Sequence, residues 1–241
     1  MDNNIVRIQK IFRGFQYRYR RLPTILYIIQ KYLRSCIIQC SSQLEDGRLN
    51  SSIDEGIIIK LIVDKFNTHD KIIIKVPKSR MWFDILVYDF MYGWLPVNIK
   101  TTKMLSSDNT GNFAMCVYAY TDYELDLHRE KTYENGEMSV ILIDKIKNKK
   151  YNTQKKKDYF FIVLNKTFPN DIIINSILGL SKLTMNLNNL PFQVCWDKNR
   201  DYMPDKIENK VKMFINCLHK SKQNWREIFL KKIKTLKRKR I

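Results

Sequence analysis

The N-terminal part of the chain carries apolar residues at helical spacing, with arginine and lysine between them. This pattern predicts a basic amphipathic helix that ends at Pro23 and a second helix over residues 24–40. A polar stretch at residues 41–47 is typical of a linker. We therefore expect a basic helical appendage over residues 1–42 and a main domain over residues 43–241.

The main domain is predicted to begin with a helix and to continue with strands. Ser52 and Glu55 have the spacing of a capping box ahead of an isoleucine-rich run, which predicts a helix that reaches about Phe66. Further helices are predicted near residues 112–123 and over the basic segment 205–241. The β-branched or aromatic runs that predict strands are residues 71–76, 81–90, 94–100, 138–143, 159–164 and 192–196. This mixture indicates an α/β or α+β fold without internal repeats.

The composition favours a folded protein that binds a polyanion. The chain has 241 residues, of which 44% are hydrophobic, which is enough to bury one sizeable core. It has 43 Lys and Arg against 24 Asp and Glu, a formal charge of +19. An excess of this size exceeds what solubility alone requires, so nucleic acid is an expected partner.

Several classes of protein are excluded by what the sequence lacks. Its five cysteines and three histidines form no zinc pattern, which predicts reduced thiols and an intracellular protein. No apolar run approaches the ~20 residues that span a bilayer, and Arg7, Lys10 and Arg13 interrupt any signal-peptide core, so no membrane partner is expected. With seven glycines and no phosphate-binding loop, nucleotide-dependent motors and dehydrogenases are also excluded.

The predicted hairpin gathers polar residues on one face. A turn centred near Tyr92 pairs residues whose numbers sum to about 184, within one or two residues, so Asp84 is expected opposite Lys100, and Leu86 opposite Asn98. Because side chains alternate between faces, Asp84, Asn98 and Lys100 share one face. With an acidic residue on the neighbouring helix, this set favours metal-assisted cleavage of a phosphodiester.

The same residues resemble a known family. Asp84 followed by Asn98-Ile-Lys-Thr-Thr102 is similar to the PD-(D/E)XK nuclease signature, in the Asp-Ile-Lys-Thr-Thr form of EcoRV- and HincII-like type II restriction endonucleases. The stretches 46–55 and 189–196 also resemble segments of such enzymes. The order of the elements, a helix with Glu, a strand with Asp and a strand ending in x-x-Lys, follows the family over residues 43–200.

The resemblance implies a mixed-sheet restriction-endonuclease fold and a role for each matching residue. It makes Asp84 the metal ligand, Lys100 the catalytic lysine and Glu55 an acid that ligates the metal or its water. Asn98 departs from the pattern, because the family carries Asp or Glu there, and an amide oxygen brings no charge to a cation. The implied cofactor is Mg²⁺, or alternatively Mn²⁺; the substrate is double-stranded DNA, the products carry 5′-phosphates, and a homodimer is usual.

Other readings stay open for these residues. Glu55 can simply close its capping box, and Lys100 can be a solvated edge-strand lysine. Gln193 and Asn199 can read base edges. The residues predicted to contact DNA are Arg48, Asn50, Ser51, Thr101, Thr102, Lys103 and Gln193.

Both ends of the chain carry basic segments. Residues 8–18 match the IQ motif and resemble helices that bind calmodulin-like proteins. The run at residues 231–240 suits a nuclear localisation signal, a phosphate-binding arm or a solvated tail. Beside a Mg²⁺-dependent endonuclease, two further functions therefore remain: a decayed nuclease that binds or packages DNA, and an IQ-motif adaptor.

Overall fold

The computed structural model describes residues 21–40, 47–67, 72–78, 81–129, 132–186 and 191–219. The IQ-like segment 8–18 and the basic run 231–240 lie outside these ranges. The helices are α2 (Thr24–Ser35), α3 (Gly47–Phe66), α4 (Phe113–Tyr120), α5 (Asn135–Lys147), α6 (Ile207–His219) and the 3-10 helix η1 (Trp196–Asn199). The strands are β1 (Ile74–Lys75), β2 (Ile85–Asp89), β3 (Gly93–Thr102), β4 (Ser107–Asn109), β5 (Phe160–Asn165), β6 (Ile172–Ser176) and β7 (Gln193–Cys195).

A mixed five-stranded sheet organises the fold, in the order β1-β2-β3-β5-β6. β2 and β3 form an antiparallel hairpin, β3 and β5 are parallel, and β5 and β6 are antiparallel. The parallel pair requires a long crossover, which contains α4 and α5. A second sheet pairs β4 with β7. The predicted class, a mixed sheet with helices, is confirmed at this level.

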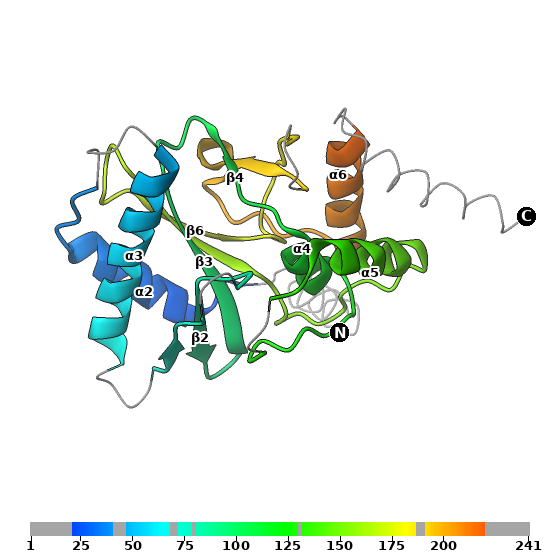
Figure 1. Ribbon diagram of the computed structural model, residues 1–241, viewed down its shortest axis with the longest axis horizontal. Coiled ribbons are helices and arrows are strands. Elements are labelled where there is room, and N and C mark those ends of the chain that lie inside the picture. Colours follow the sequence, from blue (N-terminus) through cyan, green and yellow to red (C-terminus); the bar gives the residue numbers. More distant parts are fainter. Residues whose placement is uncertain are drawn as a thin grey trace, which may run out of the picture.

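Helices cover both faces of the main sheet, with α2 and α3 on one side and α4 and α5 toward the other end of the molecule (Figure 1). Two clusters of buried residues result. One joins α2 and α3 to the sheet residues Ile85, Val87, Leu95, Val97 and Ile99, and the other joins α4 and α6 to Leu86, Phe161 and Val163. Every residue of α4 is buried, as expected for a helix that is apolar all round.

α2 protects an edge of the main sheet. From this helix, Gln30 Nε2 and Arg34 Nη2 both donate to the carbonyl of Ile172 on the edge strand β6, at 2.6 and 3.0 Å. An exposed strand edge invites pairing with other chains, and a covering helix prevents it. The described part of the predicted appendage therefore packs against the main sheet. Among the described helices, none combines the length and apolarity that crossing a bilayer requires.

Several predicted elements differ from the structure. Residues 138–143 were predicted as a strand but lie inside α5, because a short apolar run fits either structure and its buried residues follow the helical period. The helix predicted over residues 24–40 ends at Ser35, since Cys36 has extended backbone angles. The strand predicted at residues 71–76 shrinks to the two residues of β1. β4 and β6 were not predicted at all.

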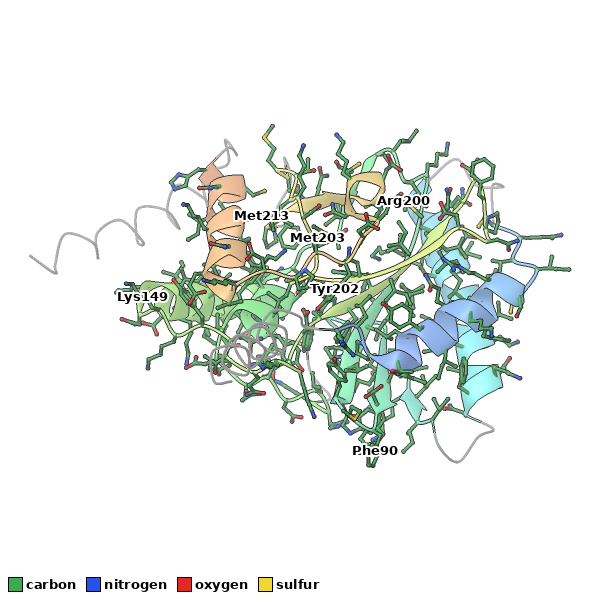
Figure 2. All side chains as sticks on the ribbon, turned by 180° about the vertical axis from the view of Figure 1, so that it is seen from behind. Phe90, Lys149, Arg200, Tyr202, Met203 and Met213 are labelled. Carbon is green, nitrogen blue, oxygen red and sulfur yellow. The ribbon has the colours of Figure 1, made fainter. Side chains whose placement is uncertain are left out.

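Gly179 offers a test of how tightly the segment after β6 is packed. A Cβ at this position would collide with the Tyr202 ring and with Asn175 Oδ1. Tyr202 lies on the segment between η1 and α6 (Figure 2). The Asn175 amide cannot retreat, because it donates to the carbonyls of Asn199 and Asp201 at 2.7 and 3.1 Å.

We therefore expect Gly179→Ala to lower the free energy of unfolding by about 1–3 kcal/mol, as overpacked cores do. The matched control is Gly56→Ala in α3, where a Cβ meets no atom within 4 Å. There the smaller backbone entropy of alanine should raise stability by about 0.5–1 kcal/mol. Urea unfolding of the two variants measures both changes. Equal stability of the two variants would contradict the packing described for Gly179.

Candidate active site

The β2–β3 hairpin places the predicted acid and amide opposite each other. Ile85 pairs with Val97 and Asp89 with Gly93, so paired residue numbers sum to 182 rather than 184. Continuing this register puts Asp84 opposite Asn98, and the amide of Asp84 donates to the carbonyl of Val97 at 3.0 Å.

The predicted pairings of Asp84 with Lys100 and of Leu86 with Asn98 are therefore wrong by two residues, since Leu86 pairs with Pro96. The turn explains the shift. The carboxylate of Asp89 accepts hydrogen bonds from the amides of Met91 and Tyr92, at 2.8 and 3.0 Å, which closes the turn early. Gly93 then takes a φ of +76°, which glycine adopts without strain.

At the end of β3, two carboxylates accept the backbone hydrogen bonds that a neighbouring strand would otherwise accept. β2 starts at Ile85, so the amides of Ile99 and Thr101 lie beyond its reach. Asp84 Oδ2 accepts from the Ile99 amide at 2.7 Å, and Glu55 hydrogen bonds to the backbone of Thr101. Buried amides need acceptors, so this arrangement holds both acids at the open side of β3.

Glu55 reaches this position from the middle of α3. Because α3 begins at Gly47, Ser52 and Glu55 both lie inside the helix, and the predicted capping box is wrong. Glu55 Oε1 instead pairs with Lys100 Nζ at 3.0 Å, with 19% and 22% of the two side chains exposed. Lys100 is therefore mostly buried and ion-paired, and the reading of it as a solvated edge-strand lysine is wrong. The helix, the strand and the hairpin thus bring Glu55, Asp84, Asn98 and Lys100 together.

Asn98 carries an unused acceptor in this cluster. The Tyr159 hydroxyl donates to the carbonyl of Trp82 at 2.6 Å and also hydrogen bonds to the Asn98 side chain. Asn98 Oδ1 is nevertheless buried without a hydrogen-bond partner. A buried acceptor of this kind is costly and calls for an explanation, such as a ligand or ion that it binds.

The pKa values of the two carboxyl groups in the cluster are raised. Burial raises the pKa of Asp84, and the Lys100 charge and the bond from the Ile99 amide only partly offset this rise. Burial likewise raises the pKa of Glu55; Lys100 opposes the rise and the neighbouring Asp84 adds to it. A carboxylate buried without a matching cation is destabilised, so added positive charge would stabilise this site.

The structure adds an acid that the sequence analysis missed. Asp108 lies on β4, and burial raises its pKa against the opposing effects of the Thr102 side chain and the Lys100 charge. Its position follows from the pairing of β4 with β7, in which Asp108 is opposite Val194. A three-residue polar strand leaves no signal in the sequence that would predict it.

Six of the seven residues predicted to contact DNA fall into two groups, at the start of α3 and at the end of β3. At the start of α3, Asn50 is buried and the Ser51 hydroxyl accepts from Lys166 at 3.1 Å, while the Arg48 side chain lies outside the described part. At the end of β3, Thr101 and Thr102 are buried and Lys103 is exposed. Of these residues, Lys103 is the one best placed for direct contact with a large partner.

Gln193 and Asn199 differ in what remains available for recognition. Gln193 Nε2 donates to Asn109 Oδ1 at 2.8 Å across the β4–β7 ribbon, and its side chain is partly exposed. Asn199 is buried, donates to the carbonyls of Lys182 and Cys195, and accepts from the amides of Ser181 and Lys182. The prediction that Asn199 reads base edges is therefore wrong, because its side-chain amide is fully used in hydrogen bonds to neighbouring backbone groups.

The donors present fit a hard, oxygen-seeking cation. Within the described residues, no three Asp, Glu, His or Cys side chains are grouped so that they could hold a metal ion. Asp84 and the unpaired Asn98 oxygen are the two facing donors. Mg²⁺ commonly binds through one or two carboxylates and completes its shell with water and substrate phosphate, so this sparse set suits it.

Comparison of the chain with protein-family models and with curated proteins finds no match.

Proposed function

We propose that this protein is a Mg²⁺-dependent DNA endonuclease with a restriction-endonuclease-like core. The observation that carries the proposal is the pair of facing oxygen donors, Asp84 and Asn98, beside the Lys100–Glu55 ion pair. The resemblance of residues 43–200 to the PD-(D/E)XK pattern supports it, as does the order of the sheet, with the hairpin leading into a parallel strand. A charge of +19 suits a polyanionic substrate.

Each residue of the cluster has a distinct part in this chemistry. Mg²⁺, when bound, polarises the phosphate and supplies an activated water. Asp84 and Asn98 offer it oxygen ligands from adjoining strands. In this proposal the Lys100 ammonium orients the attacking water and offsets charge that develops on the phosphate. Glu55 fixes that ammonium through the 3.0 Å ion pair and the bond to the backbone of Thr101.

The proposal is tested by incubating supercoiled plasmid with the full-length protein in Mg²⁺, in Mn²⁺ and in EDTA. Metal-dependent appearance of linear DNA is the expected result, and discrete fragments from longer DNA would establish sequence specificity. DNA that stays supercoiled in both metals, with protein shown to be folded, would overturn the proposal.

A second function is favoured by one observation, the neutral Asn98. Without a second carboxylate the site holds a cation more weakly, so a protein of this fold can bind DNA without cleaving it. Salt-sensitive retention of DNA together with an intact plasmid in both metals would support this alternative.

The raised pKa values of Asp84 and Glu55 also predict an unusual dependence of stability on pH. The pKa values of Asp84 and Glu55 in the folded protein lie above their ordinary values. At a pH between the ordinary and the raised pKa values, the native protein therefore binds more protons than the unfolded chain. The stabilisation is complete below the ordinary carboxyl range and is lost as pH rises through the raised pKa values. Chemical unfolding across this range should show a smaller loss for Asp84→Asn than for the parent, and identical curves would contradict the assignment.

A further inference from the structure

Lys166 forms a second lysine–carboxylate pair beside the proposed active site. Its ammonium pairs with Asp54 Oδ2 at 3.0 Å and donates to the Ser51 hydroxyl at 3.1 Å. Asp54 and Glu55 are consecutive residues of α3, and their lysine partners come from neighbouring parallel strands, Lys100 from β3 and Lys166 from the end of β5. Two consecutive acids of α3 are therefore ion-paired with two lysines, one at the carboxyl end of β3 and one at the carboxyl end of β5.

The backbone fixes Lys166 close to the end of β3. Its amide donates to the carbonyl of Thr102 at 2.8 Å, directly after the pairing of Thr102 with Asn165. Asp108 lies within electrostatic reach of both Lys100 and Lys166. The two ammonium groups thus approach a common region, and open α/β sheets bind ligands at the carboxyl ends of such strands.

The Lys166 ammonium keeps capacity for a ligand. An ammonium has three donor hydrogens; the bond to the Ser51 hydroxyl uses one of them, and Asp54 contacts the ammonium as an ion pair. The Asp54 side chain is 1% exposed and the Lys166 side chain is 17% exposed, so the lysine is the member of the pair that reaches the surface.

We propose that Lys166 is a positioning residue that binds a phosphate of the nucleic-acid backbone next to the one cleaved at Lys100. Asp54 and Ser51 orient its ammonium in advance, so that little side-chain entropy is lost when the phosphate binds. The inference rests on the proposed function, because it takes DNA as the ligand. It adds a contact that neither the sequence pattern nor the residues expected from it include.

The first test uses DNA binding rather than cleavage. Asp54→Asn with Lys166→Gln removes both charges at once, so the net charge stays the same and no buried carboxylate is left unpaired. The control is Asp122→Asn with Lys145→Gln, which removes another ion pair, of 2.7 Å, between α5 and the segment after α4. α5 lies at the opposite end of the molecule from α3 (Figure 1).

Binding of a short fluorescent DNA duplex is measured in EDTA over a range of NaCl concentrations. We expect the Asp54/Lys166 variant to bind about tenfold more weakly, as for loss of one charged hydrogen bond. Its log–log salt slope should also fall by about 0.9, the value for one phosphate. The Asp122/Lys145 control should match the parent. A parental affinity and slope in the Asp54/Lys166 variant would overturn the inference.

A second measurement needs no variant. Lysine acetylation of the parent protein, read by mass spectrometry, should show Lys166 protected by saturating duplex, and Lys145 equally reactive with and without it. The two lysines are matched, since both are ion-paired and their side chains are 17% and 19% exposed. Equal reactivity of Lys166 in the presence and absence of DNA would also overturn the inference.

The two proposals fail separately. If the parent binds DNA through Lys166 but cleaves none in Mg²⁺ or Mn²⁺, the endonuclease proposal is wrong and the phosphate contact stands. If the parent cleaves DNA while Lys166 is neither protected nor required, the contact is wrong and the endonuclease proposal stands. A parent protein that does not bind duplex at all overturns both.

Discussion

Asp84→Asn is expected to reduce DNA cleavage in Mg²⁺ by at least about 100-fold, in the range seen when one electrostatic group of an active site is removed. The substitution is close to isosteric, and the amide oxygen can still accept the hydrogen bond that Ile99 donates at 2.7 Å. It therefore removes the negative charge that attracts a cation and leaves the end of β3 supported. DNA affinity in EDTA should stay near that of the parent.

Lys100→Met is expected to have an effect of the same size. Methionine keeps an unbranched apolar stem close to that of lysine but removes the ammonium that pairs with Glu55 at 3.0 Å. The loss should appear in the single-turnover rate rather than in affinity, because the ammonium acts on the water and on charge that develops during the reaction.

Both variants have matched controls in the Asp122–Lys145 pair, whose atoms are 2.7 Å apart. Asp122→Asn and Lys145→Met change the same chemical groups away from the β2–β3 hairpin and should cleave at the parental rate. Cleavage by Asp84→Asn or Lys100→Met at close to the parental rate would show that the catalytic residues lie elsewhere.

Asn98→Asp is the second change with a large expected effect. The substitution places a second carboxylate opposite Asp84 in a partly buried site. In EDTA the two negative charges repel, and we expect the variant to lose about 1–3 kcal/mol of stability, the range for a poorly satisfied buried polar group. A divalent cation between the carboxylates should reverse this loss and bind more tightly than in the parent.

Thermal unfolding in EDTA and in Mg²⁺ measures this effect without reference to activity. Mg²⁺ should raise the Tm of Asn98→Asp more than that of the parent, since a ligand that binds only the native state stabilises it in proportion to its affinity. The Mg²⁺ concentration for half-maximal cleavage should fall by about tenfold if the added carboxylate contributes about 1.4 kcal/mol to binding. The same Tm shift and the same metal dependence in both proteins would mean that Asn98 does not line a metal site.

Short-range patterns were enough to predict the polar face and the helix that meet at the candidate site. The strand alternation around Asp84 and Lys100 predicted a shared polar face, and the isoleucine-rich run after Glu55 predicted a helix with the correct end at Phe66. These features depend on residues close in sequence, whose spacing alone sets the face on which they lie. The contact between Glu55 and Lys100 was not predicted, since the family resemblance gave Glu55 a role only toward the metal or its water.

The register of the hairpin depended on the turn, and a shift of two residues kept every side chain on its predicted face. That is why Asp84, Asn98 and Lys100 stay together although their exact pairing was wrong. Residues 138–143 were misread because a short, mostly apolar run fits a strand or a helix equally well, and only packing against α4 in the folded chain decides between them.

The tertiary structure alone brought in Asp108 and Lys166. Asp108 depends on the pairing of β4 with a strand more than eighty residues away, and Lys166 depends on β5 lying parallel to β3. Such contacts are made by chain segments that are remote in sequence, so no local pattern encodes them. The sequence by itself determined which face Asp84, Asn98 and Lys100 share; only the folded chain decided which acid meets which lysine, because that choice is made by packing between distant elements.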